Sequence, residues 1–165
     1  MKDESISQPR IDLLHPAIRE EVKNLIEQAE GVVDETLAIR VVQGLRTIEE
    51  QDALYAQGRT IPGSIVTKAK GGSSYHNYGL AIDICWLYKD DNGDYKYDDV
   101  KSWKQGGNFR KVIEIFKAAG YTWGGDFKSI PDGPHFEKTF GHNWRDLLDK
   151  YNNNDFITGT KYVNL

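Results

Sequence analysis

Residues 74–87, SYHNYGLAIDICWL, are the segment from which the fold can best be inferred. The apolar run from Leu80 to Tyr88 has the length of a strand, and its continuity indicates burial on both faces. Asp83 interrupts the run with a carboxylate, which is costly to bury unless it is paired, hydrogen-bonded or bound to a metal. Because side chains alternate along a strand, Asp83 can face a cleft while Ile82 and Ile84 pack into the core.

Two histidines are candidate partners of Asp83 because of the sequence around each of them. His76 belongs to the same stretch, and His135 lies in the sequence PDGPHFE. Two imidazoles and one carboxylate form a normal ligand set for catalytic zinc, with a fourth position open for water. Asp132 precedes His135 across a Gly-Pro turn and is a candidate general base. We therefore predict a metal site at His76, Asp83 and His135, with Asp132 beside it.

The spacing around the first histidine matches a known family motif. Ser74, His76, Gly79, Ala81 and Asp83 form the pattern S-x-H-x-x-G-x-A-x-D. This pattern resembles the first metal motif of the zinc D-Ala-D-Ala carboxypeptidase superfamily. That superfamily also contains D-Ala-D-Ala dipeptidases and the L-alanyl-D-glutamate endopeptidases found among phage endolysins.

A second family motif follows later in the chain. It consists of an acidic residue, then a histidine three positions on, then an aromatic residue, and here these are Asp132, His135 and Phe136. The order of the two motifs, their spacing and the predicted helix between them all agree with the superfamily. The resemblance covers roughly residues 37–140, which is most of the chain.

Three further stretches resemble the endopeptidase branch in particular. They are WGGD at residues 123–126, PHFE at residues 134–137, and GLRTIEEQDALYAQGR at residues 44–59. The last of these places Arg46 just before a predicted helix, as that branch does. The short chain also leaves no room for the extra domains that are common in carboxypeptidases.

The resemblance implies a role for each matched residue. Zinc is expected on His76, Asp83 and His135. Asp132 is expected to be the general base that takes a proton from the attacking water and passes it to the leaving amine. Arg46 corresponds to the arginine that polarises the scissile carbonyl and steadies the oxyanion.

Other polar residues near the motifs have open roles. Ser74 is expected to support the site by a hydrogen bond to the substrate or to the metal ligands. Asp126 either contributes to the substrate cleft or belongs to an ordinary Gly-Gly-Asp turn. Glu137 shares a strand face with His135, so it either contacts the metal ligands or is simply exposed. His15 and His142 are interpreted as surface or helix-terminal residues without a catalytic role.

Composition favours one soluble domain that spans residues 1–165. Of the 165 residues, 39% are hydrophobic and 28% charged, as in ordinary globular proteins. The net charge of −4 and the lack of a basic run argue against nucleic acid and acidic membranes as partners. The expected partner is instead the peptide stem of bacterial peptidoglycan, and nothing suggests more than a monomer. The single cysteine, Cys85, excludes an internal disulfide and is expected to be a buried thiol.

The sequence also bears on where the protein acts. Residues 1–10, MKDESISQPR, contain no apolar segment of the kind that forms a secretory signal. No stretch approaches the roughly 20 apolar residues of a transmembrane helix. We therefore expect a protein that is cytoplasmic when made and acts on the cell wall after release, as a phage endolysin or a related lysis factor does.

Periodicity and turn signals predict a small mixed fold. Thr47 and Glu50 form a capping box, and Asn92-Gly93 is a strong hairpin signal. The acidic run at residues 90–99 does not fit an EF-hand and is interpreted as a solvated hairpin. The predicted helices are residues 15–30, 47–57, 107–119 and 143–151, and the predicted strands are residues 37–43, 80–88, 121–123, 135–139 and 157–165.

Helices and strands interleave without a βαβ rhythm, which predicts an α+β domain whose small, mainly antiparallel sheet holds zinc in a cleft. The expected reaction is hydrolysis of the L-Ala–D-Glu bond in peptidoglycan stems. One alternative is a D-Ala-D-Ala carboxypeptidase or dipeptidase with the same metal chemistry. Another is a non-catalytic zinc-stabilised domain that binds cell wall, which would have no need of Asp132 as a base. A plain structural protein without a metal is the third.

Overall fold

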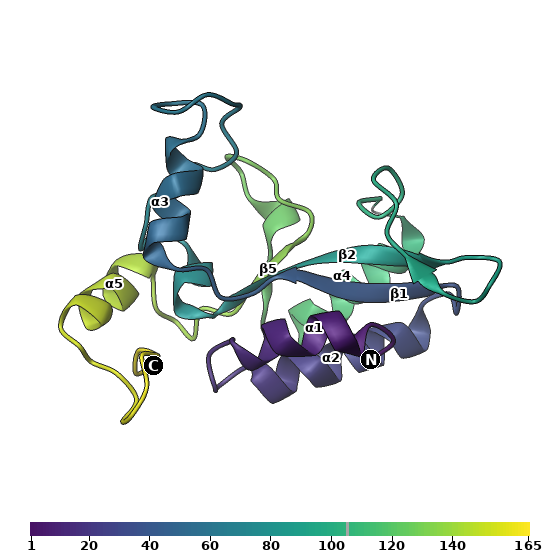
Figure 1. The fold of residues 1–165 in the computed structure, drawn as a ribbon. Helices are drawn as coiled ribbons and strands as arrows, with labels where there is room; N and C mark the ends of the chain where they lie inside the picture. The colour runs from purple at the N-terminus through teal and green to yellow at the C-terminus, as the bar shows by residue number, and fades with distance from the viewer. Residues whose placement is uncertain (105) are drawn as a thin grey trace.

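The computed structural model describes residues 1–104 and 106–165. Figure 1 shows the course of the chain, and no described helix has both the length and the apolar character needed to cross a membrane. The elements, in chain order, are α1 (Glu4–Asp12), α2 (Arg19–Val32), β1 (Leu37–Gln43), α3 (Ile48–Ala56), η1 (Tyr75–Tyr78), β2 (Ala81–Lys89), β3 (Tyr95–Lys96), α4 (Gly107–Ala118), β4 (Thr122–Trp123), η2 (Gly124–Asp126), β5 (His135–Glu137) and α5 (Trp144–Asn152).

One antiparallel sheet organises the molecule. In the described residues its strands run in the order β1-β2-β5-β4, and β3 pairs with the far end of β2. The apolar run that contains Asp83 is therefore the central strand, with neighbours on both edges. This confirms the predicted α+β fold with a small antiparallel sheet.

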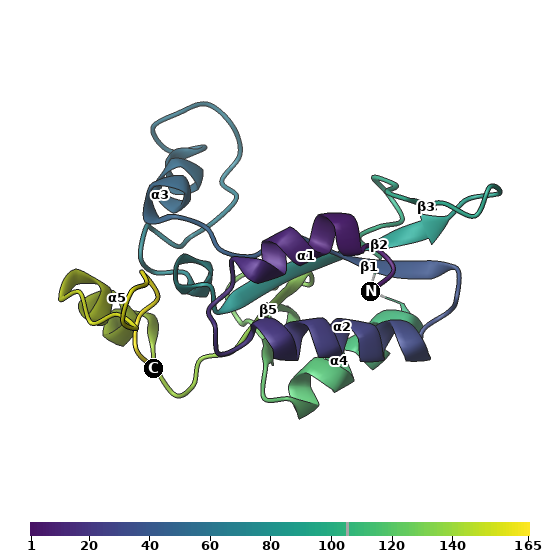
Figure 2. The same cartoon turned by 60° about the horizontal axis from the view of Figure 1, so that its bottom comes forward.

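The core lies between one face of the sheet and helices α2 and α4. Ile39 pairs with Trp86 and Val41 with Ile84, so that these four side chains share the face that meets the helices. Figure 2 shows α2 and α4 side by side against the sheet. Burying each such large apolar side chain stabilises the fold by about 1.5–3 kcal/mol. The helical side chains in the core are Val22, Leu25, Ile26, Ala29, Phe109, Val112 and Phe116.

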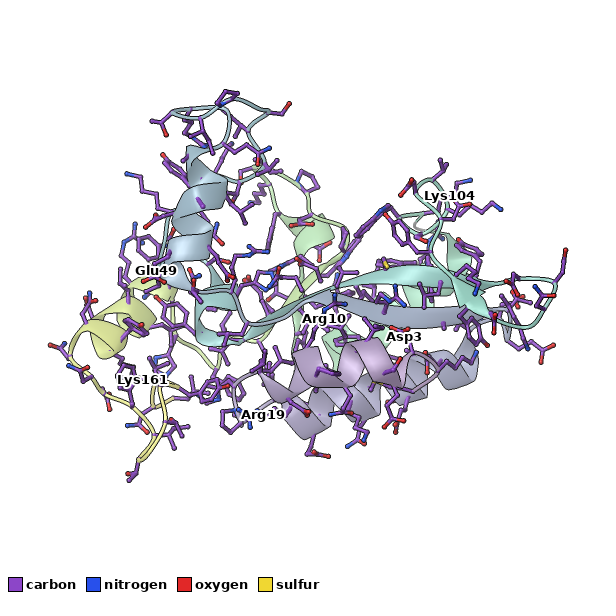
Figure 3. All side chains as sticks on the ribbon, viewed as in Figure 1. Asp3, Arg10, Arg19, Glu49, Lys104 and Lys161 are labelled. Carbon is purple, nitrogen blue, oxygen red and sulfur yellow. The ribbon has the colours of Figure 1, made fainter. Side chains whose placement is uncertain are left out.

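Helix α1 covers the free edge of β1. The Ser7 hydroxyl accepts a hydrogen bond from the Val41 amide (3.0 Å), and Arg10 donates to the Val41 carbonyl (2.6 Å). Asp3 forms a two-pronged ion pair with Arg40 of the same strand. Figure 3 shows Asp3 and Arg10 on the side of α1 that lies along β1. These contacts satisfy backbone groups that would otherwise offer an edge for another strand.

The beginning of the chain differs from the prediction. The predicted helix at residues 15–30 starts only at Arg19, and α1 precedes it. His15 and Pro16 lie in the connection, where the His15 ring accepts a hydrogen bond from the Ala17 amide. Pro9 sits inside α1, and the largely polar composition of this helix hid it from a search for apolar periodicity. The interpretation of His15 as a surface residue was wrong, because its side chain is buried.

The end of the chain also differs. The strand predicted at residues 157–165 is absent from the described structure, where a single bridge joins Phe156 and Val163. The segment is held instead by individual contacts, among them a 2.9 Å hydrogen bond from the His15 ring to the Val163 carbonyl. Elsewhere the predicted elements are confirmed within one or two residues, including β1, the capping box of Thr47 and the turn at residues 92–93.

Candidate active site

The short helix η1 and strand β2 bring His76 and Asp83 to the same place. Gly79 lies between them with a φ of +67°, a left-handed conformation that turns the chain from η1 into β2. A Cβ atom at this position would lie 2.7 Å from the backbone nitrogen of His15, so the close approach also requires glycine. Cys85, on the same strand, is buried as predicted, and burial raises the pKa of its thiol to about 11.

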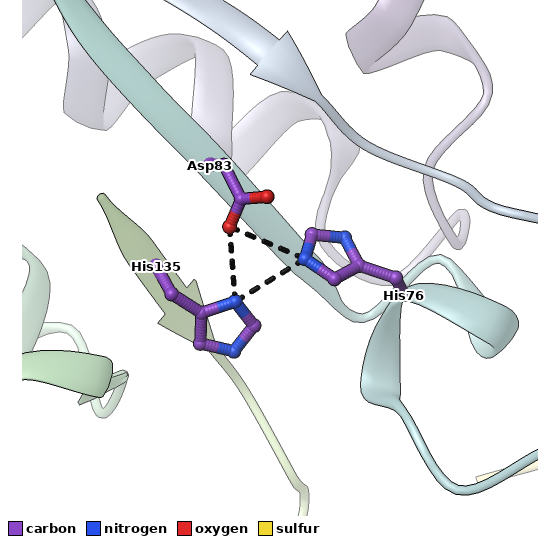
Figure 4. Close-up of side chains that lie close together, drawn as sticks. All are labelled: His76, Asp83 and His135. Atoms are coloured by element: carbon purple, nitrogen blue, oxygen red, sulfur yellow. Dashed lines mark hydrogen bonds and ion pairs between the residues drawn. The ribbon is translucent and has the colours of Figure 1, made fainter. Parts of the chain in front are cut away.

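The pairing of β2 with β5 supplies the second histidine. Asp83 lies directly opposite His135 in the register of the two strands. Asp83 Oδ1 lies 3.0 Å from His135 Nδ1 and 3.2 Å from His76 Nε2, and the two imidazole nitrogens lie 3.2 Å apart. Figure 4 shows these three side chains converging on one point from three elements. They form the His76–Asp83–His135 cluster, a group able to hold a metal ion.

The outer nitrogen of each ring has an acceptor that fixes its protonation. His76 Nδ1 donates to the Gly44 carbonyl (2.8 Å), and His135 Nε2 donates to the Glu137 carboxylate (2.9 Å). A neutral imidazole with a proton on one nitrogen has a lone pair on the other. His76 Nε2 and His135 Nδ1 therefore direct lone pairs toward each other and toward Asp83.

This arrangement fits a tetrahedral zinc ion. Ligand atoms bound to zinc at about 2.0–2.2 Å lie roughly 3.3 Å from one another when the angles are tetrahedral. The three separations in the cluster are 3.0 to 3.2 Å. Lone pairs that face one another at this range repel unless a cation lies among them. The residues present thus suit the metal that the sequence resemblance implies.

When no metal is bound, the inner nitrogens can instead carry protons and donate hydrogen bonds to Asp83, so that the charges of the cluster support each other. Burial by itself would raise the pKa of Asp83, but the charge of His76 and hydrogen bonds from both rings hold this pKa far below its usual range. Burial lowers the pKa of His135, but hydrogen bonds to Asp83 and Glu137 outweigh it and raise this pKa to about 9. The site therefore favours an ionised carboxylate and an added positive charge.

Asp132 opens onto the same cleft from the loop before β5. Its amide donates to the Gly124 carbonyl (2.9 Å), and its carbonyl accepts from the His135 amide (3.2 Å), which ties the loop to both neighbours. None of the described residues donates a hydrogen bond to the Asp132 carboxylate. Partial burial and the charge of Asp83 raise the pKa of this carboxyl group. A carboxylate with a raised pKa and no partner is suited to receive a proton.

Arg46 approaches the cluster from the segment before α3. Its Nη2 atom lies 3.9 Å from Asp83 Oδ2, and its side chain is largely buried. Its amide donates to the His76 carbonyl (3.0 Å), and Asn77 donates to its carbonyl (3.0 Å), so this backbone is joined to η1. Ser74, just before η1, also lines the cleft.

The cleft has a volume of about 460 Å³ and contains the whole cluster. Arg46 and Lys68 contribute positive charge to its lining, and Asp132 and Glu137 contribute negative charge. An apolar wall completes it, formed by Leu54, Val66, Phe127 and Ile130. A concave site with an apolar wall and a few convergent polar groups is the usual form of a substrate-binding cleft.

The cleft brings together six of the residues predicted from the sequence, namely His76, Asp83, His135, Asp132, Arg46 and Ser74. Asp126 does not belong to the cleft lining, and its carboxylate pairs with Lys117 on the outside. Glu137, whose position had two readings, contacts His135 directly. The sequence reasoning missed Gln51 and Lys68. Gln51 follows the capping-box residue Glu50, and no sequence motif indicates a role for it. Only its burial in the structure does so.

Comparisons with known proteins identify the family. A sequence profile described as D-alanyl-D-alanine carboxypeptidase matches residues 67–138. The chain is 42% identical over 126 residues to the peptidoglycan L-alanyl-D-glutamate endopeptidase CwlK of Bacillus subtilis (strain 168), across 75% of this chain and 72% of that protein. The chain belongs to the D-alanyl-D-alanine carboxypeptidase family and is a peptidase. The family resemblance drawn from the two motifs is thereby confirmed.

Solved structures agree on the fold. The L-Ala D-Glu endopeptidase ChiX of Serratia marcescens matches with a TM-score of 0.54 and 24% identity, over 88% of this chain and 92% of that one. The vancomycin-resistance D,D-dipeptidase VanXYg matches with a TM-score of 0.53 and 20% identity, over 81% of this chain and 57% of that one. At these identities the likeness concerns the fold alone.

Proposed function

We propose that this protein is a zinc peptidase that hydrolyses the L-Ala–D-Glu bond of peptidoglycan stem peptides. The observation that carries the proposal is the convergence of His76, Asp83 and His135 in a cleft that also contains the Asp132 carboxylate, to which none of the described residues donates a hydrogen bond. The choice of substrate rests on the similarity to the B. subtilis enzyme, whose name specifies this bond.

His76 Nε2, His135 Nδ1 and an oxygen of Asp83 would hold the zinc ion. When bound, zinc lowers the pKa of a coordinated water to roughly 7 and polarises a carbonyl group. Gly44 and Glu137 keep the two rings in the tautomers that this binding needs. The chain thus presents three ligands and leaves the cleft side open to water and substrate.

The remaining residues would manage protons and charge. Asp132 accepts a proton from the attacking water and returns it to the amine of D-Glu as the peptide bond breaks. Its raised pKa suits both halves of this exchange. Arg46 places positive charge where the carbonyl oxygen gains negative charge, and Ser74 borders the same space. A role of Asp126 in binding substrate stays a prediction.

Lys68 suits the acidic residue of the proposed substrate. Its side chain is exposed on the cleft and forms no ion pair with any residue that the structure describes. The D-Glu residue carries a free α-carboxylate beside the bond to be cut, and an ammonium group at the cleft can pair with it. We expect Lys68→Gln to raise KM for an L-Ala-γ-D-Glu peptide but to change KM little for the same peptide with that carboxylate amidated. An equal change for both peptides would contradict this part of the proposal.

Mass spectrometry of fragments released from purified peptidoglycan tests the main proposal. The zinc-loaded protein should create new L-Ala carboxyl ends together with new D-Glu amino ends. A zinc chelator should abolish both, and added zinc should restore them. Release of D-Ala would instead establish the carboxypeptidase or dipeptidase alternative. If the zinc-loaded protein cut nothing yet bound the wall, the non-catalytic domain would be the better account.

The cellular setting remains a prediction. Action on the wall after release, a part in lysis by a phage and a monomeric state all follow from the sequence reasoning. Analytical ultracentrifugation of the zinc-loaded protein would decide the last of these.

A further inference from the structure

Gln51 is an amide side chain buried on α3, with 1% of its surface exposed. The other residues of the helix are half-buried or exposed, so Gln51 is not part of a general apolar core. A buried amide must find hydrogen-bond partners, because losing those of water is costly. The identity of its partners therefore indicates what Gln51 does.

The amide joins two parts of the cleft lining. Its oxygen accepts a hydrogen bond from Arg46 Nη1 (2.9 Å), and its nitrogen donates to the Ala69 carbonyl (2.9 Å). The same nitrogen lies 3.5 Å from the Thr67 hydroxyl. Arg46, Thr67 and Ala69 all line the cleft. One side chain thus links the arginine of the site to the segment at residues 67–69, which also lines the cleft.

Gln51 also makes a direct hydrogen bond with the Arg46 guanidinium group. Among the described residues, Gln51 provides the hydrogen bond that this group makes within usual distance, and Asp83 lies farther off at 3.9 Å. The Arg46 Nε atom is buried without a partner in that same set. With Nη1 held by this buried acceptor, Nη2 lies on the side of Asp83.

We propose that Gln51 is a positioning residue that holds the Arg46 guanidinium group toward the His76–Asp83–His135 cluster. The proposal rests on the proposed function, in which Arg46 stabilises charge on the scissile carbonyl. Gln51 itself touches neither the substrate nor the cluster. Its effect on turnover therefore passes through Arg46.

A double-mutant cycle on the zinc-loaded enzyme tests this coupling. Gln51→Met removes both hydrogen bonds at similar volume, and it should lower kcat about tenfold with a smaller change in KM. In an Arg46→Ala background the same change should lower kcat by less than about twofold, because the group to be positioned is gone. Equal effects in the two backgrounds would overturn the proposal.

Two further variants separate positioning from structural support. Asp52, the next residue of α3, accepts a hydrogen bond from the Gly71 amide (2.7 Å) and so holds the same loop without contacting Arg46. Asp52→Ala should act additively with Arg46→Ala. Gln51→Glu keeps the acceptor for Arg46 but loses the donor to Ala69, and it should retain more kcat than Gln51→Met. If Gln51→Glu were as impaired as Gln51→Met, loss of the loop contact would explain the effect and the proposal would fail.

Nitrogen-15 NMR of the arginine side chains decides the question without any substrate. The Arg46 guanidinium signals, assigned by their loss in Arg46→Ala, should show slow rotation in the wild type and in Asp52→Ala. Rotation should become fast in Gln51→Met, and unchanged rotation would overturn the proposal. The wild type could show this change in rotation and still cut no stem peptide. That outcome would refute the proposed function but would support the positioning of Arg46 by Gln51.

Discussion

At the scale of single residues, the site depends on which atoms are left without a proton. Gly44 and Glu137 accept hydrogen bonds from the outer nitrogens of the two histidines, so that in the neutral rings the inner nitrogens present lone pairs to a metal ion. The Gly44 acceptor is a backbone carbonyl and cannot be removed by substitution, whereas the Glu137 carboxylate can be. The contribution of these outer contacts can therefore be measured at His135.

Glu137→Ala should weaken zinc binding by about 10-fold to 100-fold, because His135 would lose the acceptor that orients its ring. Competition with a fluorescent chelator measures the affinity directly. Glu137→Gln serves as the matched variant, since its amide oxygen still accepts from His135 Nε2, and it should lose less. Unaltered affinity in Glu137→Ala would show that the ring is held in some other way.

Asp132→Asn should lower kcat by about 10²-fold to 10⁴-fold, the usual contribution of a positioned general base. The amide keeps the shape of the side chain but cannot take up a proton at neutral pH. Zinc content should stay at the wild-type level, because Asp132 lies outside the metal cluster. Steady-state kinetics on a stem peptide, with metal analysis of the same sample, would check both points. A variant with full activity would refute Asp132 as the base.

At the scale of elements, the pairing of β2 with β5 and the position of η2 beside it bring the site together. Asp83 and His135 face each other across the two strands, and the Gly124 carbonyl accepts a hydrogen bond from the amide of Asp132. There is no free space at this junction. A Cβ atom on Gly124 would lie 2.5 Å from the Asp132 carbonyl oxygen and 2.9 Å from the Cβ atom of His135.

Gly124→Ala should therefore destabilise the protein by about 1–3 kcal/mol, the usual range for overpacking a tight site. It should also lower activity, because Asp132 and His135 must both shift to make room. Gly31→Ala in α2 is the control, as its new methyl group meets nothing within 4 Å. Denaturant unfolding and kinetics on the two variants test the prediction. Equal stability of both would contradict the close packing.

At the scale of the whole molecule, His15 joins three distant parts of the chain. It lies between α1 and α2, its ring contacts the Val163 carbonyl near the C-terminus, and its amide donates to Gly79 beside the metal cluster. Burial lowers the pKa of His15 below its ordinary value of 6.5, and the charge of Arg19 acts in the same direction, although the contact with Val163 opposes both. The folded protein therefore favours the neutral ring.

This pKa predicts how stability depends on pH. Between the folded pKa and about 6.5 the unfolded chain binds more protons at His15 than the folded one, so the free energy of unfolding rises with pH in this window. As pH falls through the window, that contribution should be lost, and below the folded pKa no further loss is due to His15. His15→Gln, which cannot titrate, should show a flatter profile. Denaturant titrations of the zinc-loaded protein at several pH values would test this, and parallel profiles would refute it.

Local signals in the sequence were enough for much of the fold. The strand from Leu37 to Gln43, the capping box of Thr47 and the turn at residues 92–93 each depend on neighbouring residues, and each was confirmed. Helix α1 was missed because it contains Pro9 and because its largely polar residues show no apolar helical periodicity. The C-terminal strand was wrongly predicted, because an apolar segment can be held by separate contacts without a ladder.

The family and the three candidate metal ligands could be recognised from the sequence alone, because metal ligation needs particular residue types at a characteristic spacing along the chain. The surroundings of these residues, in contrast, follow from the packing of distant segments. Asp83 and His135 are 52 positions apart, and their contact exists because β2 pairs with β5. In the same way, Gln51 reaches Ala69 and Arg46 through the placement of α3, which no local pattern records. Hydrogen bonds between distant segments depend on the packing of whole elements, and that packing is set by the core as a unit.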